Sequence, residues 1–190
     1  MFIALDGLDG CGKSSVAASL ADHLRSQGRS VEVREHPSDG FFGRRCKGML
    51  LRRGSVALAL SAGFLFTDML GTARRVRRAR REGIDVIAVR YHLSCLFLEG
   101  RCGATVHSAF RALMPRPDVD IMIDVEPETA LERISARGLS EEMFENLGSM
   151  VRTRDSMLSS DGISVISGNG TREETLALVL GLVEGRYPQP

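Results

Sequence analysis

The 190-residue sequence contains no tryptophan, only two tyrosines and four cysteines. The cysteines are Cys11, Cys46, Cys95 and Cys102, and none of them belongs to a C-x-x-C or C-x-x-H pair. This spacing argues against a structural zinc site and against a disulfide framework. Unpaired cysteines are typical of a reducing compartment, so we expect a cytoplasmic protein.

The sequence also lacks a strong charge of either sign. Its formal net charge is +1, so composition does not indicate a nucleic-acid or membrane partner. We expect no membrane span, because no apolar run looks long enough, and no signal peptide, because the first apolar strand begins at Met1. With 43% hydrophobic and 26% charged residues, we predict one globular domain over residues 1–190.

Lysine is nearly absent. Of the 25 basic residues only Lys13 and Lys47 are lysines. In a sequence that otherwise uses arginine, Lys13 calls for a chemical reason. A compact ammonium fits inside a phosphate cradle, whereas the guanidinium fork of arginine does not.

Lys13 lies in the stretch GLDGCGKSS, which matches the pattern G-x-x-x-x-G-K-[ST]. The context supports the match, because an apolar strand, Met1–Leu5, precedes it and an amphipathic helix, Val16–Gln27, follows. Glycines let successive N–H groups face a polyphosphate, and the helix N-terminus adds a favourable dipole. We expect Lys13 to reach the β- and γ-phosphates of ATP and Ser14 to ligate Mg²⁺. The expected ATP-binding residues of this loop are Gly7, Leu8, Asp9, Gly10, Cys11, Gly12, Lys13, Ser14 and Ser15.

Strands alternate with helices along the rest of the chain. Four further strands are expected at Ser30–Arg34, Ile84–Val89, Val119–Val125 and Gly162–Ile166. Helices are expected at Phe41–Leu51, Ser55–Arg81, Leu93–Leu113 (interrupted near Gly100 and Gly103), Pro127–Arg137, Ser140–Leu158 and Thr171–Gly185. Five strands separated by helices predict an α/β protein with a five-stranded parallel sheet, in the three-layer α/β/α arrangement of a P-loop NTPase fold.

Ligands of such sheets bind at the carboxyl ends of the strands. The candidate segments are therefore residues 6–14, 35–39, 90–94, 124–126 and 168–171, which include Glu35 and Ser94. Arg90 directly follows the third strand and is expected to grip phosphates bidentately. Asp9 repels phosphates, so we expect it to bind a hydroxyl of a second substrate or a Mg²⁺-bound water.

Two further segments carry charged residues. Arg133 and Arg137 precede residues 138–145, a glycine break between two expected helices. This arrangement suits a short lid, residues 137–148, that brings an arginine to the transferring phosphoryl group; an ordinary helix-to-helix turn is the alternative. Six arginines between Arg74 and Arg81 are interpreted as a solvated helix face, with a nucleic-acid or phosphate patch as the alternative. The four histidines show no metal spacing and are interpreted as structural or surface residues.

The sequence resembles the thymidylate kinase family of nucleoside monophosphate kinases almost from end to end. The matching segments are FIALDGLDGCGKSS, VREHPSDG, FLFTDM, VRYHLSCLFLEG, PRPDVDIMIDVEPETALERISARG, MVRTRD and ISVISGNGTREE. The resemblance implies transfer of the γ-phosphoryl group of ATP to the 5′-phosphate of dTMP, with Mg²⁺, by a homodimer.

The resemblance also implies roles for single residues. Because Cys11 occupies the loop position where some members carry an arginine, the lid would supply it, with Arg137 as the candidate. Lys47 would contact the acceptor phosphate, Phe66 would stack on the acceptor base, and Asp9 would hold a sugar hydroxyl. Together with these residues, the expected acceptor site comprises Glu35, Arg90, Ser94 and Glu99.

Four positions depart from the family pattern. Val89 replaces the acidic residue before Arg90, and Asp6 is the nearest substitute along the sequence. Met69 or Leu70 stands where the family has the arginine that reads thymine. Glu99 replaces a glutamine and would suit an amino-bearing base. Asp155 replaces a tyrosine.

These departures leave three hypotheses. The first is a nucleoside monophosphate kinase, for dTMP or for another monophosphate. The second is a nucleotide-binding module with weakened catalysis, which the loss of the carboxylate at Val89 favours. The third is an NTPase that acts on nucleic acid through Arg74–Arg81, and the lack of a second hydrolysis motif disfavours it.

Overall fold

A computed structural model describes residues 1–52, 55–97, 100–136 and 146–186. Within these residues five strands form one sheet in the order β2-β3-β1-β4-β5, and every neighbouring pair is parallel. The strands are β1 (Phe2–Asp6), β2 (Val31–Glu35), β3 (Asp85–Val89), β4 (Val119–Asp124) and β5 (Ser164–Ser167). The expected five-stranded parallel sheet is therefore confirmed.

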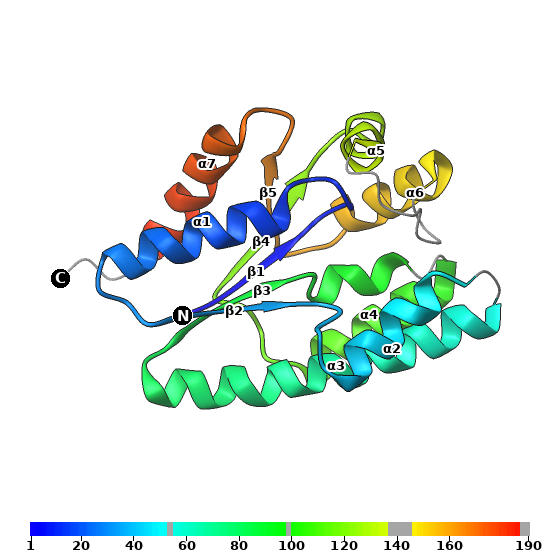
Figure 1. The fold of residues 1–190 in the computed structure, drawn as a ribbon, viewed down its shortest axis with the longest axis horizontal. Helices are drawn as coiled ribbons and strands as arrows, with labels where there is room; N and C mark the ends of the chain where they lie inside the picture. The colour runs from blue at the N-terminus through cyan, green and yellow to red at the C-terminus, as the bar shows by residue number, and fades with distance from the viewer. Residues whose placement is uncertain (53–54, 98–99, 137–145, 187–190) are drawn as a thin grey trace.

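Helices cover both faces of the sheet (Figure 1). One side carries α1 (Lys13–Ser26), α5 (Pro127–Ser135) and α7 (Arg172–Glu184). Helix α6 (Leu147–Leu158) packs its Met157 against Met122 of β4 and against Leu93 and Leu96 of the segment after β3. The other side carries α2 (Phe41–Leu50), α3 (Ser55–Glu82) and α4 (Gly100–Leu113). A short 3₁₀ helix, η1 (His92–Phe97), joins β3 to this second layer. The α/β/α layering is as expected.

The alternation of side chains along β1 divides the core into two parts. Ile3 and Leu5 point into a cluster with α1 and α7, whereas Phe2 and Ala4 point into a cluster with α3 and α4. All five residues of β1 are buried, because helices cover this central strand from both sides. The core thereby fixes the carboxyl end of β1, where the glycine-rich loop begins.

Three expected element boundaries are wrong. Helix α1 begins at Lys13 rather than at Val16, because Gly12 takes a left-handed conformation (φ 93°) that ends the loop there. The segment 93–113 divides into η1 and α4 near Gly100, as expected, but α4 runs through Gly103 without the second expected interruption. Helix α6 begins at Leu147, where the Asn146 side chain accepts a hydrogen bond from the backbone N–H of Ser149.

The expectation that no segment could span a membrane needs a correction. Residues Val56–Glu82 of α3 are long and apolar enough by length and composition, with a window of mean hydropathy 1.5. The same helix buries Met69, Ala73, Val76 and Ala79 in the core against the sheet. A core helix passes this length test as well, so the finding is weak support for a membrane span.

Three of the six arginines between Arg74 and Arg81 pair with acidic groups of this chain. Arg75 contacts Glu32 and Glu82, Arg78 also contacts Glu82, and Arg80 pairs with Asp118. Each of these contacts balances charge within the chain. This pattern favours the interpretation of a solvated helix face over that of a nucleic-acid patch.

Asp85 is the one charged residue within β3, and its surroundings explain it. The carboxylate is 2% exposed and accepts hydrogen bonds from Arg29 Nε (2.6 Å), Arg29 Nη2 (3.0 Å) and the nitrogen of Met1 (2.6 Å). Burial opposes its charge, but the hydrogen bonds hold the pKa of Asp85 below its usual value. The group ties β3 to the turn between α1 and β2.

We therefore predict that Asp85→Asn lowers the free energy of unfolding by about 2 to 3 kcal/mol at pH 7, because it leaves Arg29 without its buried partner. The difference should disappear as the pH falls through the lowered pKa of Asp85, since the wild-type carboxylate then becomes neutral too. Urea unfolding at several pH values measures this. The control is Asp22→Asn, which breaks an exposed ion pair with Arg25 and should cost at most about 1 kcal/mol. Equal losses in the two variants would contradict the prediction.

Candidate functional site

The loop between β1 and α1 requires glycine at two positions. Gly7 (φ 141°) and Gly10 (φ 84°) have backbone conformations that other residues rarely adopt. A Cβ atom on Gly7 would meet the carbonyl oxygen of Ile123, and one on Gly10 would meet that of Ala130. The loop is thus pressed against β4 and α5, and its amides can turn away from them. No side chain caps the start of α1, so the first helical N–H groups can bind an anion.

The Lys13 side chain curls into this loop. Its ammonium donates hydrogen bonds to the carbonyl oxygens of Gly7 (2.9 Å) and Leu8 (2.6 Å) and lies 3.6 Å from an Asp9 oxygen. The side chain is 4% exposed. A positive charge therefore sits at the centre of the loop, held by groups that it can exchange for other oxygen acceptors.

Asp9 and Arg90 join the loop to the end of β3. The Asp9 Oδ1 atom accepts hydrogen bonds from Arg90 Nε (3.0 Å) and Nη2 (2.5 Å). Burial opposes the charge of Asp9, but Arg90 and Lys13 hold its pKa below the usual value. Among the described residues Arg90 is the one non-glycine residue with a positive φ, at 60°. Strained backbone of this kind is concentrated at functional sites.

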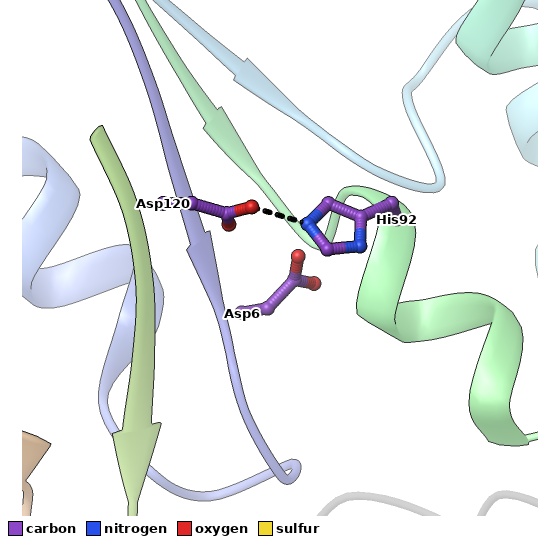
Figure 2. A group of neighbouring side chains, drawn as sticks. All are labelled: Asp6, His92 and Asp120. Atoms are coloured by element: carbon purple, nitrogen blue, oxygen red, sulfur yellow. Dashed lines mark hydrogen bonds and ion pairs between the residues drawn. The ribbon is translucent and has the colours of Figure 1, made fainter. Parts of the chain in front are cut away.

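Asp6 cannot take the place of the carboxylate missing at Val89. It is completely buried and accepts hydrogen bonds from the backbone N–H groups of Tyr91 (2.8 Å) and Leu93 (3.3 Å) and from the Ser94 hydroxyl (3.1 Å). Figure 2 shows it directed towards His92. Asp6 therefore holds the turn after β3 and does not face the loop.

Glu35 offers a carboxylate in the region that Val89 leaves without one. It ends β2, where it is the register partner of Val89 in the neighbouring strand. Its carboxylate accepts a hydrogen bond from the Ser14 hydroxyl and lies 3.6 Å from Arg90. A hydroxyl and a carboxylate oxygen are ligands that Mg²⁺ prefers. These two residues are thus the pair in the described part of the loop region that could hold the metal.

A cavity opens beside the loop, between the end of β3 and helices α2 and α3. Five expected acceptor residues line it: Asp9, Lys47, Phe66, Arg90 and Ser94. The wall between them is apolar and includes Leu50, Leu58, Leu65, Phe97 and Val106. Glu35 lines an adjoining open depression together with Lys47 and Arg90. The cavity therefore has a charged end at the loop and an apolar end at α3.

Two lining residues have partners that set their positions. Lys47 donates a hydrogen bond to the exposed carboxylate of Asp39 (2.8 Å), so its ammonium lies at the edge of the cavity. Phe66 makes an edge-to-face contact with Phe110, with ring centroids 6.3 Å apart. This contact holds the Phe66 ring on the apolar wall.

His36 is a site residue that the sequence interpretation missed. It lines the cavity, is 1% exposed, and its Nδ1 atom lies 2.8 Å from Asp68 Oδ2. Its Nε2 atom is buried without a hydrogen-bond partner in the described structure. His36 directly follows β2 and lies within the strand-end segment 35–39, so its position in the sequence did indicate a site residue. It was interpreted as a structural or surface residue because the four histidines are scattered along the sequence.

Of the remaining expected residues, Arg133 is described by the structure, whereas Arg137 and Glu99 are not. Arg133 of α5 donates a hydrogen bond to the carbonyl oxygen of Gly168 (3.0 Å), which places it at the carboxyl ends of β4 and β5. Arg154, not expected as a site residue, binds Asp124 and Glu126 through both of its Nη groups and Nε. Arg137, Glu99 and the expected lid residues up to 145 lie outside the described residues.

Comparisons with known proteins agree with this arrangement. The family model for thymidylate kinase matches residues 5–173. A thymidylate kinase of Xylella fastidiosa (strain 9a5c) is 33% identical over 196 residues, which cover 96% of this chain and 90% of that protein. A probable thymidylate kinase of Pyrobaculum calidifontis is 32% identical over 190 residues, covering 97% of this chain and 96% of that protein.

A solved structure, that of thymidylate kinase from Candida albicans, has the same fold. It superposes with a TM-score of 0.75 at 16% identity, over 97% of this chain and 91% of that one. The family match extends over most of the sequence and includes the glycine-rich loop, Arg90 and the cavity residues between them. The chain therefore belongs to the thymidylate kinase family and is a nucleoside monophosphate kinase.

Proposed function

We propose that this kinase transfers the γ-phosphoryl group of ATP to the 5′-phosphate of dTMP. The observation that carries the proposal is the cavity beside the glycine-rich loop, whose charged end is formed by Asp9 and Arg90 of two adjacent strand ends. A nucleotide in that cavity would present its phosphate to the loop. Phosphoryl transfer needs mainly positioning and charge neutralisation, and this arrangement supplies both.

The donor would bind on the loop. The uncapped N–H groups at the start of α1 would bind phosphate oxygens. The Lys13 ammonium would exchange its present carbonyl partners, Gly7 and Leu8, for phosphate oxygens. Gly7, Leu8, Asp9, Gly10, Cys11, Gly12 and Ser15 would contribute backbone contacts, and Arg133 would lie against the nucleotide from α5. We propose Arg137 as the arginine that would reach the γ-phosphoryl group during transfer.

Ser14 and Glu35 would hold Mg²⁺. When bound, Mg²⁺ neutralises charge on the β- and γ-phosphates. The Ser14 hydroxyl and the Glu35 carboxylate already meet in the structure, and both are hard oxygen donors. Glu35 thereby weakens the argument for a module with impaired catalysis, because a carboxylate is present despite Val89.

The acceptor would lie with its phosphate at Arg90 and Lys47 and its base on Phe66. The apolar wall around Phe66 suits a base with a methyl group, since buried apolar contact is favourable. Asp9 would bind the sugar hydroxyl, and Ser94 would line the site between sugar and base. Another monophosphate, with an amino-bearing base facing Glu99, is the alternative acceptor.

We further propose a single domain over residues 1–190, a lid near residues 137–148 and a cytoplasmic homodimer. The dimer is supported by large apolar side chains that α2 and α3 leave exposed, among them Phe41, Val56 and Leu60. An apolar surface of this kind marks an interaction site. We propose no nucleic-acid partner, because Arg75, Arg78 and Arg80 of the Arg74–Arg81 segment pair with acidic residues of the chain.

A coupled ADP-release assay with Mg·ATP and a panel of monophosphates (dTMP, dUMP, dCMP, dAMP and dGMP) tests the function. We expect turnover that depends on the acceptor and is fastest with dTMP. ADP release without any acceptor would instead identify an NTPase. Nucleotide binding without turnover would identify a binding module, and a preference for dCMP or dAMP would overturn the dTMP assignment.

The metal site makes a separate prediction. Glu35→Gln should weaken the binding of Mn²⁺, used as a probe for Mg²⁺, about tenfold or more in the presence of a non-hydrolysable ATP analogue. Electron paramagnetic resonance measures the unbound Mn²⁺ directly. The matched control is Glu184→Gln on α7, where the carboxylate is 51% exposed compared with 47% for Glu35. Unchanged Mn²⁺ affinity in Glu35→Gln would remove this residue from the metal site.

A further inference from the structure

Four titratable side chains lie together next to the turn that follows β3, and the catalytic scheme uses none of them. They are Asp6 at the end of β1, His92 in η1, His107 in α4 and Asp120 in β4. The first three are buried, and Asp120 is 15% exposed. Figure 2 shows the His92 ring facing the carboxylates of both Asp6 and Asp120. Four elements of the fold thus meet at this cluster.

The contacts of His92 limit its protonation states. Its Nε2 atom lies 2.6 Å from Asp120 Oδ2, and its Nδ1 atom lies 2.9 Å from His107 Nε2. The contact with the carboxylate places a proton on Nε2. The contact with His107 fits either a donating Nδ1–H, as in an imidazolium, or an Nδ1 that accepts from His107 Nε2–H. We assign the second proton to His92, because ligand atoms of two carboxylates, Asp6 and Asp120, lie within 4.8 Å of its ring nitrogen.

The charges around the two rings agree with this assignment. Burial opposes a cation at His92, but the carboxylates of Asp120 and Asp6 outweigh it and raise the pKa of His92, while Arg111 of α4 acts in the opposite sense. Burial, the His92 cation and Arg111 lower the pKa of His107 to about 4. Tyr91 also faces the carboxylates, and its own pKa is raised above the usual range, so it stays neutral.

Asp6 links this cluster to the substrate site. Its carboxylate accepts from Tyr91 N–H, Leu93 N–H and the Ser94 hydroxyl, which are donors of the turn that follows β3. The turn includes Arg90, with its left-handed backbone, and Ser94, and both line the acceptor cavity. Burial and the nearby Asp120 carboxylate raise the pKa of Asp6, whereas His92 and the hydrogen bonds from Ser94 and Tyr91 act in the opposite sense, so loss of the His92 cation would favour the protonated form of Asp6.

We propose that His92 is a positioning residue for the acceptor nucleotide. As an imidazolium it keeps Asp6 and Asp120 ionised, and ionised Asp6 holds the 90–94 turn so that Arg90 and Ser94 face the cavity. The identity of the acceptor rests on the proposed function, whereas the state of His92 does not.

A bound metal ion is the competing explanation for the same side chains. Ligand atoms of Asp6, His92 and Asp120 lie within 4.8 Å of one another. A metal on His92 Nε2 would have to replace the proton that the Asp120 contact requires. The 2.6 Å separation of these two atoms is that of a charge-assisted hydrogen bond, so we favour the proton.

Imidazole NMR spectra of the full-length protein without substrate test the protonation. We expect His92 to be doubly protonated at pH 7 and His107 to be neutral. A neutral His92 at pH 7 would overturn the proposal, and this result would not depend on which nucleotide is phosphorylated. Tight one-to-one binding of Zn²⁺, lost in both His92→Gln and Asp120→Asn, would also overturn it in favour of the metal.

Kinetics separate positioning from a merely structural role. His92→Gln removes the charge and should lower kcat/KM for the acceptor about tenfold, with KM for ATP unchanged within about twofold. The matched control is His23→Gln, an exposed histidine of α1, which should change neither value. A loss of unfolding stability in His92→Gln with unchanged acceptor kinetics would overturn the proposal.

The pH dependence of the acceptor KM is a second test, with Asp120→Asn as a variant that keeps the shape of the cluster. Because the pKa of His92 is raised, its contribution is complete at low pH and is lost as the pH rises through that pKa. The acceptor KM of the wild type should therefore rise on the alkaline side. Asp120→Asn removes one carboxylate, so the rise should begin at lower pH. The proposal would be contradicted if NMR shows a lowered pKa of His92 in Asp120→Asn while the pH profile of the acceptor KM stays where it is in the wild type.

Discussion

The structure depends on a short run of backbone N–H groups that must turn towards one point after β1. Gly7 and Gly10 allow this because a side chain at either would collide with the backbone of β4 or α5. We propose that the N–H groups of this loop bind an anion, and Lys13 adds the one cation that the loop itself contains. The central strand must therefore be rigid, and its complete burial between the two helical layers provides this.

The parallel sheet brings the remaining parts of the site to the same edge. Arg90 after β3, Glu35 at the end of β2 and Asp9 in the loop meet there although they are far apart in the sequence. Their charges balance one another, because Arg90 pairs with Asp9 and lies 3.6 Å from Glu35. The Glu35 carboxylate also accepts a hydrogen bond from Ser14. Parallel register places Glu35 beside Val89, and we propose that its carboxylate offsets the loss of an acidic residue there.

Much of this could be predicted from residues alone. Hydrophobic periodicity and the glycine pattern were enough for the five strands, the loop and the strand-end location of Arg90 and Ser94. The start of α6 was wrong because Asn146 caps it, whereas the sequence also offered Ser140 as a cap. The charged residue Asp85 in an apolar strand could not be explained from the sequence, because its partner Arg29 lies in the turn between α1 and β2.

Contacts between distant residues could not be predicted. The pairing of His36 with Asp68, of Ser14 with Glu35, and of His92 with Asp6 and Asp120 each depends on how separate elements pack. Single-sequence patterns report on spacing within an element, so they do not identify such partners. Histidines scattered along the chain therefore looked structural, although two of them face or support the cavity.

The central claim is that the loop amides and the Lys13 ammonium bind the triphosphate of the donor. Isothermal titration with a non-hydrolysable ATP analogue and Mg²⁺ tests it most directly in Lys13→Ala, with Lys47→Ala, the other lysine of the chain, as control. The account predicts that Lys13→Ala weakens the affinity about a hundredfold or more while the protein stays folded, and that Lys47→Ala leaves it unchanged. Unchanged affinity in a folded Lys13→Ala protein would contradict the account.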